Sequence, residues 1–168
     1  VRPADGDAAN LPWRLQPQLS GGGYFFDLAS HELDILDYLL GPIVAAEGMG
    51  GNQAGLYAAE DIVTGTFRFD SGVQGVGVWS FTTDAHEGRD RIELIGDKGR
   101  IEFACFALDN PVIVTRQGVV EEKQFTMPAH VQQPLIQTLV DELLGRGLCP
   151  STGESGARAS WVMGQLVS

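Results

Sequence analysis

The chain has 168 residues, of which 22 are acidic and 11 are Lys or Arg, and its formal net charge is −11. This deficit of basic side chains argues against nucleic acid and anionic membranes as partners, because Lys and Arg provide the attraction to both. Hydrophobic residues make up 43% of the chain, and a domain of this length buries a sizeable core.

Two cysteines, Cys105 and Cys149, lie far apart without a CxxC or Cys/His spacing, so neither a disulfide framework nor a zinc site is indicated. No apolar run reaches the roughly 18 residues of a membrane span, and the N-terminus lacks the pattern of a signal peptide. We therefore expect a cytoplasmic protein. Because the first residue is Val1 and not Met, we also expect a piece of a longer chain or a processed product.

Residues 1–20 are polar and rich in Pro, Asp and Asn, which indicates a loop or an irregular arm. Glycines 21–23 then precede a stretch in which leucines and Ile35 recur at helical spacing. The pattern predicts a helix over 27–40, which Gly41 and Pro42 should end.

After this helix the hydrophobic period changes to two, and turn residues separate seven short runs. The predicted strands are 43–49, 62–69, 73–81, 91–95, 100–103, 112–115 and 119–125. Because no helix separates these strands, we expect a largely antiparallel sheet.

Two further helices are predicted, one from about Pro134 to Gly145 and one preceded by a capping box of Ser151 and Glu154. The order of helix, strands and helices predicts an α+β fold with an open, largely antiparallel mixed sheet and helices packed on one face. The predicted domain organisation is an arm over 1–20 and a single domain over 21–168.

The first predicted helix carries the strongest candidate for chemistry, since Asp27, His31, Asp34 and Tyr38 share one side of it. A carboxylate at i and an imidazole at i+4 can touch, and such a pair suits general acid or base work on a hydroxyl. The alternative is structural: Asp27 caps the helix, His31 is a satisfied, partly buried histidine and Asp34 faces water.

The sequence contains neither a complete zinc-binding motif nor a complete dinucleotide-binding motif. Residue 35 is Ile where the HExxH zinc motif needs His, so we expect no metal site. The glycine runs at 48–51 and 75–77 each lack the third glycine of GxGxxG, and the second falls inside a predicted strand.

The motif residues resemble those of a known family. Trp13-Arg14, the segment 20–34 with sequence SGGGYFFDLASHELD, and Leu39–Gly41 resemble the opening of the C-terminal domain in the glucose-fructose oxidoreductase, inositol dehydrogenase and rhizopine-catabolism family. Residues 91–101 are similar to a hairpin of that domain, and residues 152–158 to the start of its last helix.

The resemblance implies an NAD(P)-dependent oxidoreductase acting on a sugar, polyol or similar polyhydroxylated compound. In that family an N-terminal Rossmann domain binds NAD or NADP, and no counterpart of its fingerprint exists here. Asp27 and His31 match the catalytic pair of the family, while Arg14, Gly22 and Gly23 would join them in binding substrate. Ala29 stands where the family commonly has glycine.

We therefore expect this chain alone neither to bind NAD(P) tightly nor to turn over substrate. We also expect a homo-oligomer through a sheet face that carries Gly75, Gly77, Trp79 and Phe81. The alternative for this face is that Trp79 and Phe81 pack against the helices of the chain itself. The alternative for function is a non-catalytic ligand-binding or scaffold module of the same fold.

Overall fold

A computed structural model describes residues 10–84 and 86–168. The chain divides into two compact units: unit 1 is Val1–Glu87 with Pro150–Ser168, and unit 2 is Gly88–Cys149. A single domain over 21–168 therefore stays a prediction, and positions 1–9 of the expected arm lie outside the described residues.

The described part of the arm is helical. It forms the short 3-10 helix η2 (Trp13–Leu15) and the single helical turn α1 (Pro17–Ser20). Pro17 occupies the first position of α1, where its fixed φ suits a helix and its missing N–H is not needed. The expected loop is thus more regular than its polar composition indicated.

Helix α2 (Tyr24–Leu40) begins three residues before the predicted start. Its first turn carries Phe25, which is fully buried, so the aromatic residues ahead of Asp27 belong to the helix as core residues. At the other end Gly41 has a φ of +92° and donates its N–H to the Asp37 carbonyl at 2.9 Å. The predicted end at Gly41 and Pro42 is confirmed.

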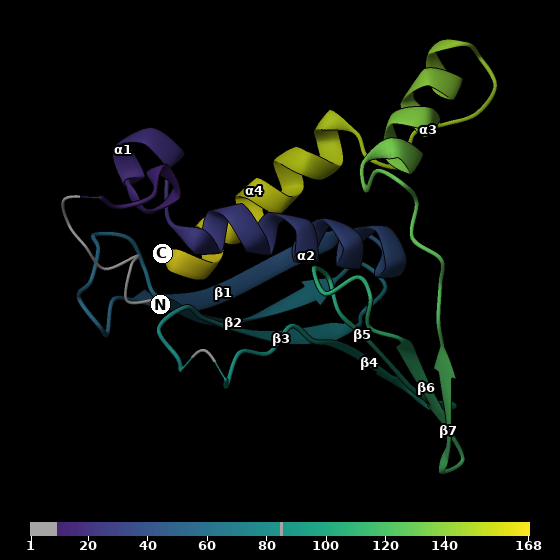
Figure 1. The fold of residues 1–168 in the computed structure, drawn as a ribbon, viewed down its shortest axis with the longest axis horizontal. Helices are drawn as coiled ribbons and strands as arrows, with labels where there is room; N and C mark the ends of the chain where they lie inside the picture. Colours follow the sequence, from purple (N-terminus) through teal and green to yellow (C-terminus); the bar gives the residue numbers. More distant parts are fainter. Residues whose placement is uncertain (1–9, 85) are drawn as a thin grey trace. The chain divides into compact units, whose positions relative to one another are not determined.

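Three antiparallel strands form the sheet of unit 1, namely β1 (Ile43–Gly51), β2 (Ile62–Phe69) and β3 (Gln74–Ser80). Helices α2 and α4 (Gly153–Val167) lie side by side across one face of this sheet (Figure 1). Their buried side chains and those of the sheet form one apolar core.

A row of glycines crosses the sheet, because the register pairs Gly65 with both Gly48 and Gly77, and α4 covers the Gly48 and Gly65 part of this row. A Cβ on Gly48 would lie 2.5 Å from the Leu166 carbonyl oxygen, and a Cβ on Gly65 would meet the Leu166 side chain. The glycines thus let α4 approach the sheet backbone, which explains part of the unusual glycine content.

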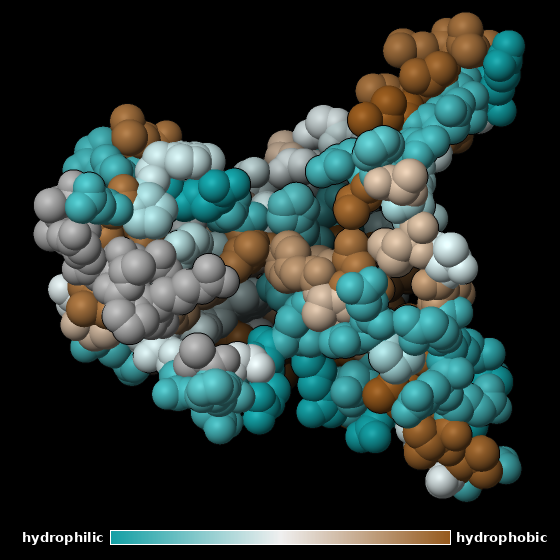
Figure 2. Space-filling model, viewed as in Figure 1, coloured by the Kyte–Doolittle hydropathy of each residue, from teal (hydrophilic) through white to brown (hydrophobic). Residues whose placement is uncertain are grey.

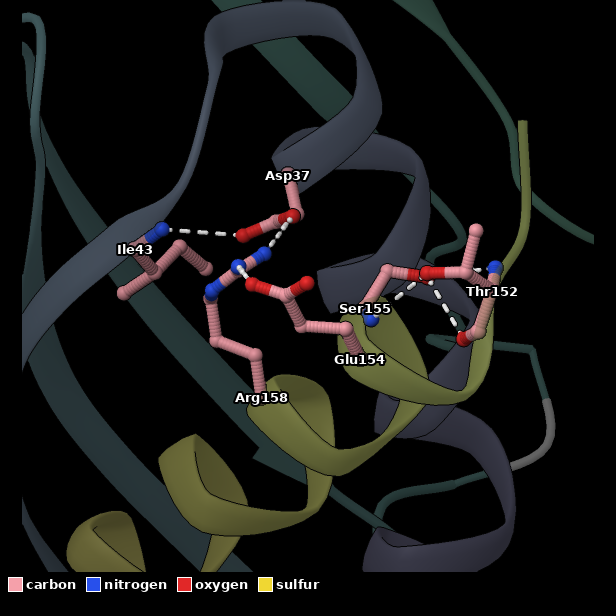
Figure 3. Close-up of polar contacts among 6 residues, drawn as sticks. All are labelled: Asp37, Ile43, Thr152, Glu154, Ser155 and Arg158. Atoms are coloured by element: carbon pink, nitrogen blue, oxygen red, sulfur yellow. Dashed lines mark hydrogen bonds and ion pairs between the residues drawn. The ribbon is translucent and has the colours of Figure 1, made fainter. Parts of the chain in front are cut away.

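Helix α4 is held at its N-terminal end by polar contacts (Figure 3). Thr152 and Ser155 form the capping box, so the predicted box of Ser151 and Glu154 is wrong by one residue. The physical reason is that the Ser155 hydroxyl reaches the Thr152 N–H at 3.1 Å, as a longer side chain at this third position would.

Asp37 links α2, α4 and the first strand. One carboxylate oxygen accepts from the Ile43 N–H at 2.9 Å, and the other lies 2.8 Å from the Arg158 guanidinium (Figure 3). The Asp37 side chain is only 10% exposed. Because this carboxylate is nearly desolvated, the contacts are stronger than a surface ion pair.

The expected docking face of the sheet is instead the inner face. Trp79 and Phe81 pack against the helix-covered core, and the Trp79 indole N–H donates to the Glu32 carboxylate of α2. A Cβ on Gly75 would meet the Phe67 ring, and one on Gly77 the Trp79 ring. The prediction of an exposed face with these residues is wrong, and the alternative is confirmed.

Unit 2 contains four antiparallel strands in chain order followed by helix α3 (Gln133–Leu143). The strands are β4 (Ile92–Gly96), β5 (Gly99–Phe103), β6 (Val112–Arg116) and β7 (Val119–Lys123). Figure 2 shows hydrophobic residues along one side of α3 and hydrophilic residues along the other. The predicted helical stripe is therefore confirmed, although no α3 residue is buried.

The predicted α+β class is confirmed, with α2 and α4 on one face of an open sheet. Within the described part of the chain, seven strands form two sheets of three and four strands, and every pair of neighbouring strands is antiparallel. Within the described ranges, no helix is long and apolar enough to cross a bilayer.

Candidate functional site

The predicted site residues Arg14 and Asp27 are in direct contact. The Arg14 Nε donates to the Asp27 Oδ2 at 2.7 Å, which joins η2 to the first turns of α2. The two side chains are 44% and 34% exposed, so the pair lies at the surface and can meet a ligand. The structure thus places Arg14, which the sequence linked to the site only by resemblance, directly on the candidate catalytic carboxylate.

Trp13 lies on the other side of this arginine. The Arg14 Cζ is 4.5 Å from the centre of the Trp13 ring, which is a cation–π contact. Trp13 is 53% exposed although it is a large apolar residue. Three neighbouring groups therefore form a surface cluster that contains an aromatic ring, a guanidinium and a carboxylate.

A second small core supports this cluster from below. Leu15, in the same short helix as Trp13 and Arg14, is buried against Tyr57 and Ala59. The loop 52–61 carries these partners, and its fully buried Asp61 carboxylate accepts from two of the loop's backbone N–H groups at 2.7 Å. Because these hydrogen bonds stabilise the conformation of the loop, the loop provides a fixed surface against which η2 packs.

Asn52 adds a second internal support to the same loop. Its side-chain amide donates to the backbone carbonyls of Tyr57 and Ala59, and its oxygen accepts from the Gly55 N–H at 2.8 Å. Periodicity could not identify this loop, because its contribution to the site comes from contacts distant in sequence.

His31 follows Asp27 by four residues on α2 and is exposed. This spacing places both side chains on the same side of the helix. The N-cap of α2 is Gly23, so Asp27 lies in the first turn and does not cap the helix, and His31 is exposed. The structural alternative is therefore wrong for the cap at Asp27, whereas a satisfied His31 and the catalytic role of the pair both stay predictions. Asp34 is half-buried and Tyr38 is exposed on the same helix.

Gly22 and Gly23 are both buried. A Cβ on Gly22 would meet the Phe26 ring, and one on Gly23 would lie 2.6 Å from the Ala59 Cβ. The two glycines therefore allow close packing beneath the site. Their expected contact with substrate stays a prediction.

The remaining glycine runs do not form a dinucleotide site. Gly48 and Gly50 lie within β1, while Gly75 and Gly77 lie within β3, and none opens a helix at a strand-to-helix turn. These two glycine runs thus lack the geometry of a pyrophosphate-binding turn. Across residues 10–84 and 86–168, no group of three His, Cys, Asp or Glu is arranged to hold a metal ion.

Comparison with known proteins places the chain in a family. A family model described as the GFO/IDH/MocA C-terminal domain matches residues 1–102. The chain belongs to this family. The match includes η2, α2 and the three-stranded sheet, and therefore the whole Arg14, Asp27 and His31 cluster.

Two relatives within reach of sequence comparison are oxidoreductases. Oxidoreductase P35 of Formosa agariphila is 32% identical over 151 residues, which cover 90% of this chain and 45% of that protein. The 1,5-anhydro-D-fructose reductase of Ensifer adhaerens is 30% identical over 148 residues, which cover 86% of this chain and 44% of that protein. The chain thus spans less than half the length of either relative.

Solved structures of the GFO/IDH/MocA type share the fold. A levoglucosan dehydrogenase, solved in complex with NADH and levoglucosan, matches with a TM-score of 0.75 and 18% identity. The match covers 96% of this chain and 52% of that one. At this level of identity the likeness establishes the fold alone.

Proposed function

We propose that this chain is the substrate-binding and oligomerisation domain of an NAD(P)-dependent oxidoreductase that acts on a sugar, polyol or similar polyhydroxylated compound. The observation that carries the proposal is the exposed Arg14 and Asp27 pair, with His31 one helical turn further along α2. The names of the relatives, a 1,5-anhydro-D-fructose reductase and a levoglucosan dehydrogenase, support the substrate class.

Each of the three side chains suits one part of an alcohol oxidation. Arg14 can donate hydrogen bonds to a substrate hydroxyl, and the Asp27 carboxylate can accept one from it. His31, as a neutral imidazole, accepts the hydroxyl proton as the carbonyl forms. Bound NAD(P) would supply the hydride acceptor for this oxidation. Because the described glycine runs do not fit a dinucleotide, we assign its binding mainly to residues outside this chain.

The outer face of the three-stranded sheet is the surface we propose for self-association in a cytoplasmic oligomer. Met49, Val76 and Val78 are each at least two-thirds exposed on this face, opposite the helices. Neighbouring exposed apolar residues on a sheet are typical of a protein interface. This outer face replaces the face with Gly75, Gly77, Trp79 and Phe81, which the sequence had favoured as the interface.

Replacement of His31 by Asn in the full-length oxidoreductase tests the catalytic proposal. We expect kcat to fall by about 10²-fold or more, because the proton acceptor is lost while an exposed position tolerates the change. His130→Asn is the matched control, since His130 is also exposed but lies in unit 2. Equal turnover of both variants and the parent would favour the non-catalytic binding module.

A further inference from the structure

Arg14 makes contacts with Asp27 and Trp13 and keeps further N–H donors available. Its Nε donates a hydrogen bond to Asp27, and its Cζ lies over the Trp13 ring. Among the described residues, its two terminal nitrogens have no hydrogen-bond partner. A flexible side chain is thereby restrained by two contacts, while N–H groups of its terminal nitrogens remain available to donate to a ligand.

We propose that Trp13 is a positioning residue, which stacks on Arg14 and so fixes the donors that Arg14 presents to uncharged hydroxyl groups beside Asp27. The inference rests on the proposed function and deepens it. It also accounts for a large aromatic side chain that remains half exposed at the surface. An arginine held in place before binding loses less side-chain entropy when the ligand arrives.

The charges around the pair favour a neutral ligand. Helix α2 contains Asp27, Glu32, Asp34 and Asp37 and no Lys or Arg. Two of these are engaged elsewhere, since Asp37 is nearly buried beside Arg158 and Glu32 accepts from Trp79. The positive charge of Arg14 is balanced by Asp27, so the pair keeps no net positive charge that would attract an anionic ligand. A hydroxyl group both donates and accepts, and it therefore matches a guanidinium next to a carboxylate.

The first measurement needs no turnover. NMR on this chain follows exchange of the Arg14 Nε proton with solvent in the parent, Trp13→Leu and Trp13→Phe. We expect exchange to accelerate about five-fold in Trp13→Leu and to remain near the parent value in Trp13→Phe, which retains an aromatic face. Leu19→Ala is the matched control, because Leu19 is an exposed apolar residue of the same arm. Unchanged exchange in Trp13→Leu would overturn the positioning role.

The second measurement is a double-mutant cycle in the full-length oxidoreductase, with levoglucosan and 1,5-anhydro-D-fructose as uncharged probes and D-glucuronate as the anionic one. We expect Trp13→Leu to raise KM for an uncharged probe about five-fold with kcat changed less than two-fold. Arg14→Lys should raise KM at least as much, and the double variant should match Arg14→Lys alone, since Trp13 acts through Arg14.

The outcomes separate the two proposals. If the fold-increases in KM from the two substitutions multiply in the double variant, Trp13 acts independently of Arg14. A lower KM for D-glucuronate than for either sugar would contradict the preference for a neutral ligand. Both results overturn the inference. Absence of turnover with every probe would count against the proposed function, while the exchange measurement would still decide the role of Trp13.

Discussion

The two faces of the three-stranded sheet differ in residue size and in exposure to solvent. On the inner face, Gly48 leaves room for the backbone of α4 and Gly65 for the Leu166 side chain, while Trp79 packs against the core and donates to Glu32 of α2. On the outer face, Val76 and Val78 are 78% and 67% exposed. The covered face thus combines glycines with large buried aromatic residues, whereas the bare face carries exposed valines.

This contrast shows that a smooth, glycine-bearing face of a strand is not by itself a docking surface. Gly75 and Gly77 do accept close neighbours, but these are the Phe67 and Trp79 rings of the same sheet, while Gly48 and Gly65 lie against the chain's own last helix. The absence of a side chain therefore indicates that another segment can pack closely at that position. Only the tertiary structure shows which segment it is.

Substitution of Gly48 by Ala should produce the largest loss of stability. The added Cβ would lie within 3 Å of the Leu166 carbonyl oxygen, the Leu166 Cα and the Thr64 carbonyl oxygen, all of which are backbone atoms. We expect the free energy of unfolding to fall by about 3 kcal/mol, measured by urea denaturation.

Gly156→Ala provides the matched control, because nothing lies within 4 Å of a Cβ at this position of α4. There the same change should raise stability by about 0.5 to 1 kcal/mol through helix propensity. Equal effects of the two substitutions would contradict the view that α4 rests directly on the glycine row.

Replacement of Asp37 by Ala should have an intermediate effect. The change removes the acceptor for Ile43 and the nearly buried partner of Arg158, and we expect a loss of about 2 kcal/mol in thermal or urea unfolding. Glu154 contacts the same arginine at 3.3 Å but is 86% exposed, so Glu154→Ala should cost no more than about 0.5 kcal/mol. A reversed order would show that α4 is not anchored through Asp37.

The double substitution Val76→Thr and Val78→Thr should change the stability of the chain least, by no more than about 0.5 kcal/mol, because both sites are exposed and Thr retains β propensity. If the outer face is the oligomer interface, sedimentation equilibrium of the full-length protein should show association weakened at least ten-fold. Undiminished association would exclude this face as the interface.

Local patterns in the sequence predicted most of the elements. The first two strands begin where alternation begins, at Ile43 and Ile62, and α2 ends at the predicted glycine. These features depend on neighbours along the chain, so periodicity and turn residues suffice. The start of α2 and the cap of α4 were misplaced by one to three residues, because burial of Phe25 and the reach of the Ser155 hydroxyl depend on local geometry beyond the pattern.

The candidate site was predicted only in part. The spacing of Asp27 and His31 follows from helix geometry, and the resemblance added Arg14. The contact between Arg14 and Asp27, the stacking of Trp13 and the support from loop 52–61 join segments that are distant along the chain. No periodicity records such contacts, since they depend on how η2 is seated on its own small core.

The sequence by itself thus determined the α+β class, the position of nearly every element and the helix that bears the candidate acid and histidine. Those properties depend on hydrophobic period, turn chemistry and helical spacing, which are local. Only the tertiary structure decided which face of the sheet is covered and which groups surround Asp27. Both depend on close packing between segments far apart in the chain. At such contacts the absence of a single Cβ, as at Gly48, decides whether a helix can approach.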